Sequence, residues 1–167
     1  ASEDDIRRIV EAAIQPIQKR KIPLSKANLT ELQDIIWKNS LKEIKLDERG
    51  AIGYTYKTLA SGIWALRQGV RAIQESKLDE LPRVFENAIS DLSWAGGDSD
   101  TNGAVAGSLL GALVGYSSLP AQWKTDLSDV DWLLSKADAA TFLILRQGPP
   151  YDWENDPDNL FDGGKGE

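Results

Sequence analysis

The chain has 167 residues, of which 41% are hydrophobic and 27% are charged, and its formal net charge is −7. This size and composition predict one soluble globular domain, and the acidic balance excludes a general binder of nucleic acids or anionic membranes, because no basic stripe is present to meet phosphates. The sequence contains neither cysteine nor histidine, which excludes disulfides, thiolate nucleophiles, Ser-His-Asp triads and ordinary zinc sites.

The first two predicted helices are amphipathic. Apolar residues recur at helical spacing from Ile6 to Ile17, and Ser2 with the acidic residues 3–5 suits the amino end of such a helix. Pro16 falls late in this pattern and is predicted to end or kink the helix. A second helix is predicted over about 28–40, where leucine and isoleucine residues form one apolar stripe.

Two further helices are predicted before a glycine-containing break. Small and apolar residues three and four apart predict a closely packed, central helix over 53–69. Another helix is predicted over about 79–92, with Pro82 in its first turn. The helical periodicity then breaks at residues 94–97.

The segment after the break is almost wholly small or apolar. Residues 103–115 predict a helix that is buried on most sides and too short to span a bilayer. A turn follows at Pro120 and Trp123, and a last helix is predicted over about 128–145. Because no segment alternates with a period of two, we predict an all-α fold.

We expect two regions along the chain. Residues 1–146 are predicted to form the helical domain. Residues 147–167 are acidic and contain proline and glycine, so we predict that this tail is poorly ordered or wrapped over the surface.

Two carboxylates and a hydroxyl stand close together in the segment Gly96-Gly-Asp-Ser-Asp-Thr-Asn-Gly103. Asp98, Asp100 and Thr101 offer hard oxygen ligands, which suit Mg²⁺, Mn²⁺ or Ca²⁺. The preceding glycines let the backbone bend, so that side chains of alternate residues can converge on one ion. Three protein oxygens leave the coordination incomplete, so water, substrate or other segments must supply the rest.

Helix capping is the alternative explanation for the same residues. Asp98, Ser99, Asp100 or Thr101 could each cap the amino end of a helix that begins near Asn102, which is the commonest reason to find such residues there. An isolated Asp-x-Asp spacing does not decide between a cap and a metal ligand.

A longer pattern surrounds this turn. Residues 96–115 combine Gly-Gly-Asp-Ser-Asp-Thr with a helix of small residues, and Leu119-Pro-x-x-Trp123 follows. This pattern resembles the signature near the carboxyl end of the ADP-ribosylglycohydrolases, such as the dinitrogenase reductase-activating glycohydrolases. Gly53–Leu66 and Phe85–Ile89 are similar to the two helices that precede the signature in that family. The resemblance covers about residues 50–132.

The resemblance implies a fold, a cofactor and a reaction. The family fold is an orthogonal bundle of helices around a pair of divalent ions, usually Mg²⁺. These ions hold the ribose hydroxyls of an ADP-ribosyl group while water displaces the attached group. By resemblance, Asp98, Asp100 and Thr101 are carboxy-terminal metal ligands. The resemblance thus implies an N- or O-glycosyl hydrolase that removes ADP-ribose from a modified protein or small molecule.

Part of the family pattern is missing from this sequence. The glycine-rich opening motif, the catalytic acidic residue, the Thr/Ser-Asp-Asp ligand set and the central histidine motif are absent, and the single Asp-Asp pair, Asp4-Asp5, lies at a helix start. The chain has no methionine and begins at Ala1, so we expect a fragment or a processed piece. We therefore expect an incomplete fold, and a second polypeptide that supplies the amino-terminal half with its catalytic acid.

Weaker hypotheses concern residues around the turn. Tyr54 could stack on adenine or line the cleft, although aromatic residues at helical spacing more often pack in a core. Ser93, Gly97 and Ser99 are further candidate substrate contacts, and Ser99 would either face elsewhere or contribute through its backbone.

Two other classes of function stay open. The chain could be an inactive relative that binds ADP-ribose and metal without turnover. It could also be a structural protein, because the family fold resembles a lens crystallin of the J1 type. The sequence shows no signal-peptide pattern and no apolar run of membrane-spanning length, so we expect an intracellular protein without a membrane partner.

Overall fold

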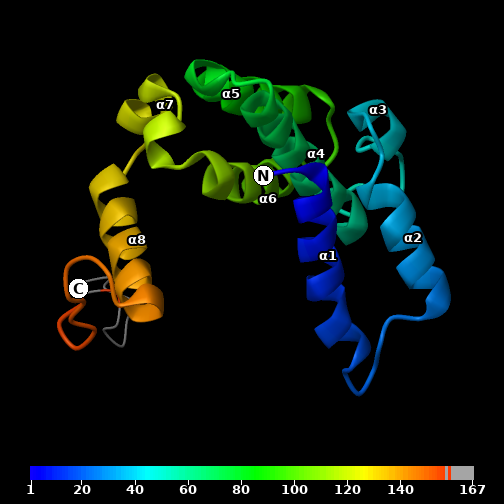
Figure 1. Ribbon diagram of the computed structural model, residues 1–167, viewed down its shortest axis with the longest axis horizontal. Helices are drawn as coiled ribbons and strands as arrows, with labels where there is room; N and C mark the ends of the chain where they lie inside the picture. The colour runs from blue at the N-terminus through cyan, green and yellow to red at the C-terminus, as the bar shows by residue number, and fades with distance from the viewer. Residues whose placement is uncertain (157, 159–167) are drawn as a thin grey trace. The chain divides into compact units, whose positions relative to one another are not determined.

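The computed structural model describes residues 1–156 and residue 158. Helices are the regular structure of this part of the chain, and it contains no strand, so the predicted all-α fold is confirmed. The helices follow one another as Figure 1 shows. The chain divides into two compact units, Ala1–Ala121 and a second unit that starts at Gln122. Among the helices described, none is both long enough and apolar enough to cross a membrane.

The first unit opens with two amphipathic helices, α1 (Glu3–Gln18) and α2 (Lys26–Ile36). Ser2 caps α1 through a capping box with Asp5, which confirms the predicted amino end. Pro16 lies inside the last turn of α1, close to the end that its ring was predicted to impose.

The second helix is shorter than predicted. α2 ends at Ile36, and a separate helix, α3 (Leu41–Ile44), follows it. Ser40 and Glu43 form a capping box at the start of α3, and this box satisfies backbone N–H groups at a new helix start. The chain therefore breaks near residue 38 instead of continuing to residue 40.

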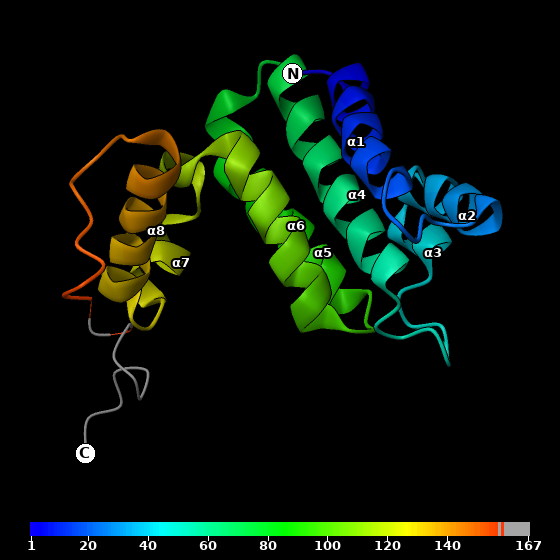
Figure 2. The same ribbon diagram turned by 90° about the horizontal axis from the view of Figure 1, so that it is seen from below.

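Three long helices form the centre of the first unit. α4 spans Thr55–Gln74, a 3-10 turn spans Leu78–Glu80, α5 spans Leu81–Trp94 and α6 spans Ser99–Val114. Figure 2 shows α4, α5 and α6 together, with α1 along the other side of α4. The central helix predicted over 53–69 is confirmed and extends further, to residue 74.

α4 and α6 approach closely because α4 has glycines where the two helices meet. A Cβ atom at Gly62 would lie 2.8 Å from Leu109, and one at Gly69 would lie 2.5 Å from Leu110 and 2.9 Å from Leu113. The contacts advance along both helices together, so α4 and α6 are parallel. Their amino ends therefore lie at the same end of the unit.

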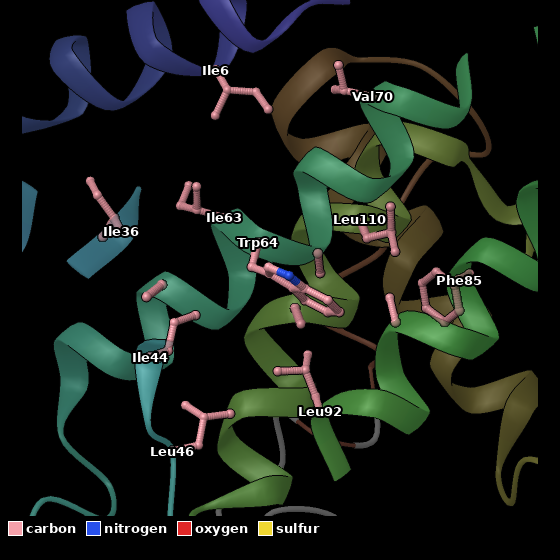
Figure 3. Close-up of a cluster of buried hydrophobic side chains, with 14 of the residues drawn as sticks. Ile6, Ile36, Ile44, Leu46, Ile63, Trp64, Val70, Phe85, Leu92 and Leu110 are labelled. Atoms are coloured by element: carbon pink, nitrogen blue, oxygen red, sulfur yellow. The ribbon is translucent and has the colours of Figure 1, made fainter. Parts of the chain in front are cut away.

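The core of the first unit gathers around these helices. It includes Ile6, Ile36, Ile44, Leu46, Ile63, Trp64, Val70, Phe85, Leu92 and Leu110. In Figure 3, Trp64 lies between Ile44 on one side and Phe85 and Leu110 on the other. α4 is buried along most of its length, so the core fixes where its amino end lies.

The second unit is built on α8 (Val130–Leu145), which confirms the last predicted helix. A short helix, α7 (Ala121–Asp126), stands where a turn was predicted. Lys136 of α8 pairs with Asp156 at 2.5 Å and with Asp158 at 2.6 Å. The described part of the acidic tail therefore lies against α8. The rest of the predicted tail, residues 157 and 159–167, falls outside the described residues.

Candidate metal centre

Residues 96–103 form the segment that we call the Asp98 turn. It lies where the amino ends of α4 and α6 meet. A Cβ atom at Gly53, which precedes α4, would lie 3.3 Å from Oδ2 of Asp98. Gly53 has a φ of 76°, a left-handed conformation that favours glycine. The absence of a side chain there leaves space beside the Asp98 carboxylate.

The helix that carries the turn begins earlier than predicted. α6 starts at Ser99, whereas the sequence predicted a start near Asn102. Asp100 and Thr101 therefore lie in the first turn of the helix. Asp98 occupies the N-cap position, yet its side chain accepts no hydrogen bond from the N–H groups of α6. The capping hypothesis therefore does not explain the Asp98 carboxylate.

The two carboxylates of the turn lie side by side. A hydrogen bond between the Asp98 and Asp100 side chains holds the pKa of Asp100 below its ordinary value. The Thr101 backbone N–H, which donates to Oδ1 of Asp100 at 2.8 Å, acts in the same direction. A hydrogen bond between two carboxyl groups needs a proton on one of them, and a divalent cation that replaced this proton would be held by oxygens of both side chains.

The donor atoms of the turn suit a hard divalent cation, although they do not complete its shell. Asp98, Asp100 and Thr101 offer carboxylate and hydroxyl oxygens, which Mg²⁺, Mn²⁺ and Ca²⁺ prefer. Within the described residues, no group of three or more Asp, Glu, Cys or His residues is placed to hold a metal ion. The turn would therefore supply part of an octahedral Mg²⁺ shell.

The backbone before Asp98 rests on the loop that follows α3. Gly96 and Gly97 both have a φ of 77°. A Cβ atom at Gly97 would lie 2.3 Å from the carbonyl oxygen of Leu46, and one at Gly96 would lie 3.5 Å from Cβ of Asp47. Close packing against Leu46 therefore explains the glycine at residue 97, which was predicted from the sequence as a candidate substrate contact.

A buried lysine joins this loop to α4. Nζ of Lys57 donates to the carbonyl oxygen of Lys45 at 2.6 Å and to Oε2 of Glu48 at 2.8 Å. The Lys57 side chain is only 7% exposed, and its ammonium group holds the pKa of Glu48 below its ordinary value. Lys57 is not among the site residues predicted from the sequence. A lysine in the first turn of an otherwise small and apolar helix was the signal that could have identified it.

The weaker candidates have partners within the protein. The Tyr54 hydroxyl donates to Oε1 of Glu31 at 3.0 Å, and the Tyr54 ring centroid lies 5.0 Å from that of Tyr56. Oγ of Ser99 donates to the carbonyl oxygen of Ser93 at 3.4 Å. This last bond ties the start of α6 to the end of α5, so both serines help to shape the turn.

An open groove of about 880 Å³ borders the loop that supports the turn. α3, the residues after it, α4 and the end of α5 line this groove, which includes Asp47 and Trp94. The Trp94 side chain is 90% exposed. The groove therefore offers an accessible aromatic surface next to the residues that contact Gly96 and Gly97.

Comparison with known proteins identifies the family. The sequence profile described as ADP-ribosylglycohydrolase matches residues 1–151. The chain therefore belongs to the ADP-ribosylglycohydrolase family. The match confirms the resemblance and extends it beyond residues 50–132.

One curated relative carries the name ADP-ribosylarginine hydrolase Tri1 and comes from Serratia proteamaculans strain 568. It is 28% identical to this chain over 106 residues, which make up 64% of this chain and 25% of the relative. The chain thus spans about a quarter of the length of the relative that it matches. Among solved structures, none matches the chain significantly.

Proposed function

We propose that this chain carries the carboxy-terminal metal ligands of a hydrolase that removes ADP-ribose from a modified protein or small molecule. Family membership supports the substrate class. The placement of Asp98 is the observation that carries the proposal. Its carboxylate stands at the N-cap without capping α6, lies beside Asp100 and faces the space left by Gly53.

The proposed ligands are Asp98, Asp100 and Thr101, and the proposed cation is Mg²⁺, with Mn²⁺ or Ca²⁺ as alternatives. When bound, one of two such ions would supply positive charge that holds and orients the ribose hydroxyls. The protein's own part is to hold three oxygens in place. The start of α6 fixes Asp100 and Thr101, and the packing of Gly97 on Leu46 fixes the backbone before Asp98.

The space around these ligands suits a sugar that approaches from solvent. Asp100 and Thr101 are exposed, and no side chain covers Asp98 from residue 53. Tyr54 stays a proposed substrate contact, because it directly precedes α4 at the same end of the unit. Gly97, Ser93 and Ser99 contribute to the proposal mainly through the backbone of the turn.

We also propose that turnover needs a second polypeptide. Glycoside hydrolysis requires a carboxylic acid to protonate the leaving group as the bond breaks through an oxocarbenium-like state. By resemblance, that acid and the Thr/Ser-Asp-Asp ligands belong to an amino-terminal half.

Calorimetric titration tests the proposed function. ADP-ribose is titrated into the chain with and without Mg²⁺, and the same titrations are made on an Asp98→Asn, Asp100→Asn double variant. We expect ADP-ribose to bind only with Mg²⁺ and only to the unaltered chain, because the ribose hydroxyls complete the metal shell. The chain alone should release no ADP-ribose from ADP-ribosylarginine.

The same titration separates the rival functions. Metal-dependent binding that stays without turnover after an amino-terminal half has been added would indicate an inactive binding relative. Absence of heat with both Mg²⁺ and ADP-ribose would leave a structural role and refute the proposed hydrolase.

A further inference from the structure

We infer that Lys57 is a positioning residue for the Asp98 turn. It holds the loop of residues 45–48 against Gly96 and Gly97, and so fixes the backbone that aims the Asp98 carboxylate. This inference rests on the proposed metal-binding role of Asp98.

The first step is the anchoring of the loop. Lys57 lies in the first turn of α4, a helix fixed by the core. Its ammonium group bonds to the loop at two points, the Lys45 carbonyl and the Glu48 carboxylate. Because both points lie within four consecutive residues, one buried cation secures the whole loop. Hydrogen bonds to a charged group are roughly twice as strong as neutral ones.

The second step is the conformation that the loop must keep. Lys45 is the C-cap residue of α3, and its backbone lies in the left-handed region, with a φ of 56°. A residue other than glycine pays about 1–2 kcal/mol for that conformation, so the loop is not held there by its own preference. The bond from Lys57 to the carbonyl of Lys45 stabilises the conformation that directs the chain toward Leu46.

The third step is the contact between the loop and the turn. Leu46 is 2% exposed, and its carbonyl group occupies the space where a side chain at Gly97 would lie. Asp47 contacts Gly96 in the same way at a longer distance. If the loop shifts, these two glycines lose the surface against which they are packed. Asp98 follows Gly97 directly, so its carboxylate would shift with them.

A purely structural role for Lys57 is the rival explanation, and α4 offers a matched control. Arg67 is also buried in α4, at 5% exposure, and donates to Glu3, to the Lys38 carbonyl and to Asn39. None of these partners contacts the glycines before Asp98 in the packing described above. Removal of Arg67 should therefore lower stability without moving the turn.

The experiment compares Lys57→Met with Arg67→Met. The first readout is Mg²⁺ affinity, measured from the amide NMR shifts of the turn. Loss of a residue that orients metal ligands typically weakens affinity 10- to 100-fold, so we expect about a 10-fold weaker Kd for Lys57→Met and an unchanged Kd for Arg67→Met. Glu48→Gln keeps the bond to the Lys45 carbonyl and should weaken affinity less. If Lys57→Met does not fold, Glu48→Gln replaces it as the test variant.

The second readout needs no metal. Gly96 N–H donates to the Ser93 carbonyl, and Asn102 N–H donates to the Asp98 carbonyl. Exchange of these two amides with solvent should be faster in Lys57→Met than in Arg67→Met when both are compared at equal global stability. Equal exchange in the two variants, or an unchanged Mg²⁺ affinity in Lys57→Met, would overturn the inference.

The two readouts keep the inference separate from the proposed function. If the unaltered chain binds no Mg²⁺ while Lys57→Met still loosens the Gly96 and Asn102 amides, the proposed metal site fails and the positioning of the turn by Lys57 stands. If Mg²⁺ binds and neither Lys57→Met nor Glu48→Gln weakens it, the metal site stands and the inference fails.

Discussion

The two halves of α4 each bury one cationic side chain, and the two cations hold different parts of the chain. Lys57 in the first turn secures the loop of residues 45–48. Arg67 in the second half secures Glu3 of α1 and the connection between α2 and α3 at residues 38–39. Both have an acidic partner and further hydrogen-bond acceptors, as buried charges require.

The difference between the two cations lies in what their partners touch. The partners of Lys57 belong to a loop that packs against Gly96 and Gly97. The partners of Arg67 belong to α1 and to a connection without a candidate site residue. Burial and hydrogen bonding therefore do not by themselves separate a functional residue from a structural one. The residues that the partners of Lys57 and Arg67 contact in turn do distinguish the two cations.

The largest expected effect on stability comes from adding a side chain at Gly97, where the Leu46 carbonyl group leaves no room for one. Gly97→Ala would place a Cβ 2.3 Å from the Leu46 carbonyl oxygen, at a φ of 77°. Strain and overpacking together should cost roughly 2–5 kcal/mol, measured as the free energy of unfolding in urea. A loss below about 0.5 kcal/mol, the usual range for a surface change, would show that the loop does not support the turn.

The next effect tests the half of α4 that is remote from the site. Arg67→Met leaves Glu3, the Lys38 carbonyl and Asn39 without their shared donor. Removing one partner of a buried charged network should cost roughly 2–4 kcal/mol. Chemical denaturation measures the loss, and Mg²⁺ affinity should not change. A parallel loss of Mg²⁺ affinity would erase the proposed distinction between the two halves.

A substitution at Gly103 is expected to stabilise the fold, in contrast to a substitution at Gly97. A Cβ atom at Gly103, in the second turn of α6, would have no neighbour within 4 Å. Gly103→Ala should therefore raise the free energy of unfolding by about 0.5–1 kcal/mol, because alanine loses less backbone entropy in a helix. Thermal denaturation checks the sign. Destabilisation would mean that α6 is packed more tightly at residue 103 than the structure shows.

The smallest expected effect is the pH dependence of the stability that the Arg67–Glu3 ion pair contributes. The hydrogen bond from Arg67 is the main cause that lowers the pKa of Glu3 below its ordinary value of 4.5. A lowered carboxylate pKa stabilises the folded state above the ordinary pKa, and the contribution is lost as the pH falls through the folded-state value. The stability difference between the wild type and Glu3→Gln should therefore shrink as the pH falls below 4.5. A difference that stays constant from pH 7 to the acid limit would contradict this account.

The sequence predicted the helices that have a strong apolar period. α1, α4 and α5 lie close to their predicted ranges because the spacing of their apolar side chains reveals the face that packs on the core. α8 also lies close to its predicted range, although Ala139 is its single buried residue. The break between α2 and α3 depends on a local capping box at Ser40 and Glu43. This capping box involves only two residues, and the apolar stripe of the preceding helix led to a prediction that continued through it.

The candidate site could be predicted only in part. Asp98, Asp100 and Thr101 were selected from a local motif, and their roles as metal ligands stay a prediction. The contacts that support them join Gly97 to Leu46, Gly53 to Asp98 and Lys57 to Lys45. Each joins segments that are distant in sequence, so no local spacing reveals it. The start of α6 at Ser99 was missed because packing of the preceding glycines, and not a side-chain cap, sets that start.

Titration of the chain with Mg²⁺, followed by amide NMR, tests the central claim most directly. We predict saturable shifts confined to the turn around Asp98, Asp100 and Thr101, with a Kd on the order of 1 mM because the shell is incomplete. The Asp98→Asn, Asp100→Asn variant should lose these shifts, and Gly103→Ala should keep them. Shifts that fail to saturate, or that persist in the double variant, would contradict a metal site at this turn.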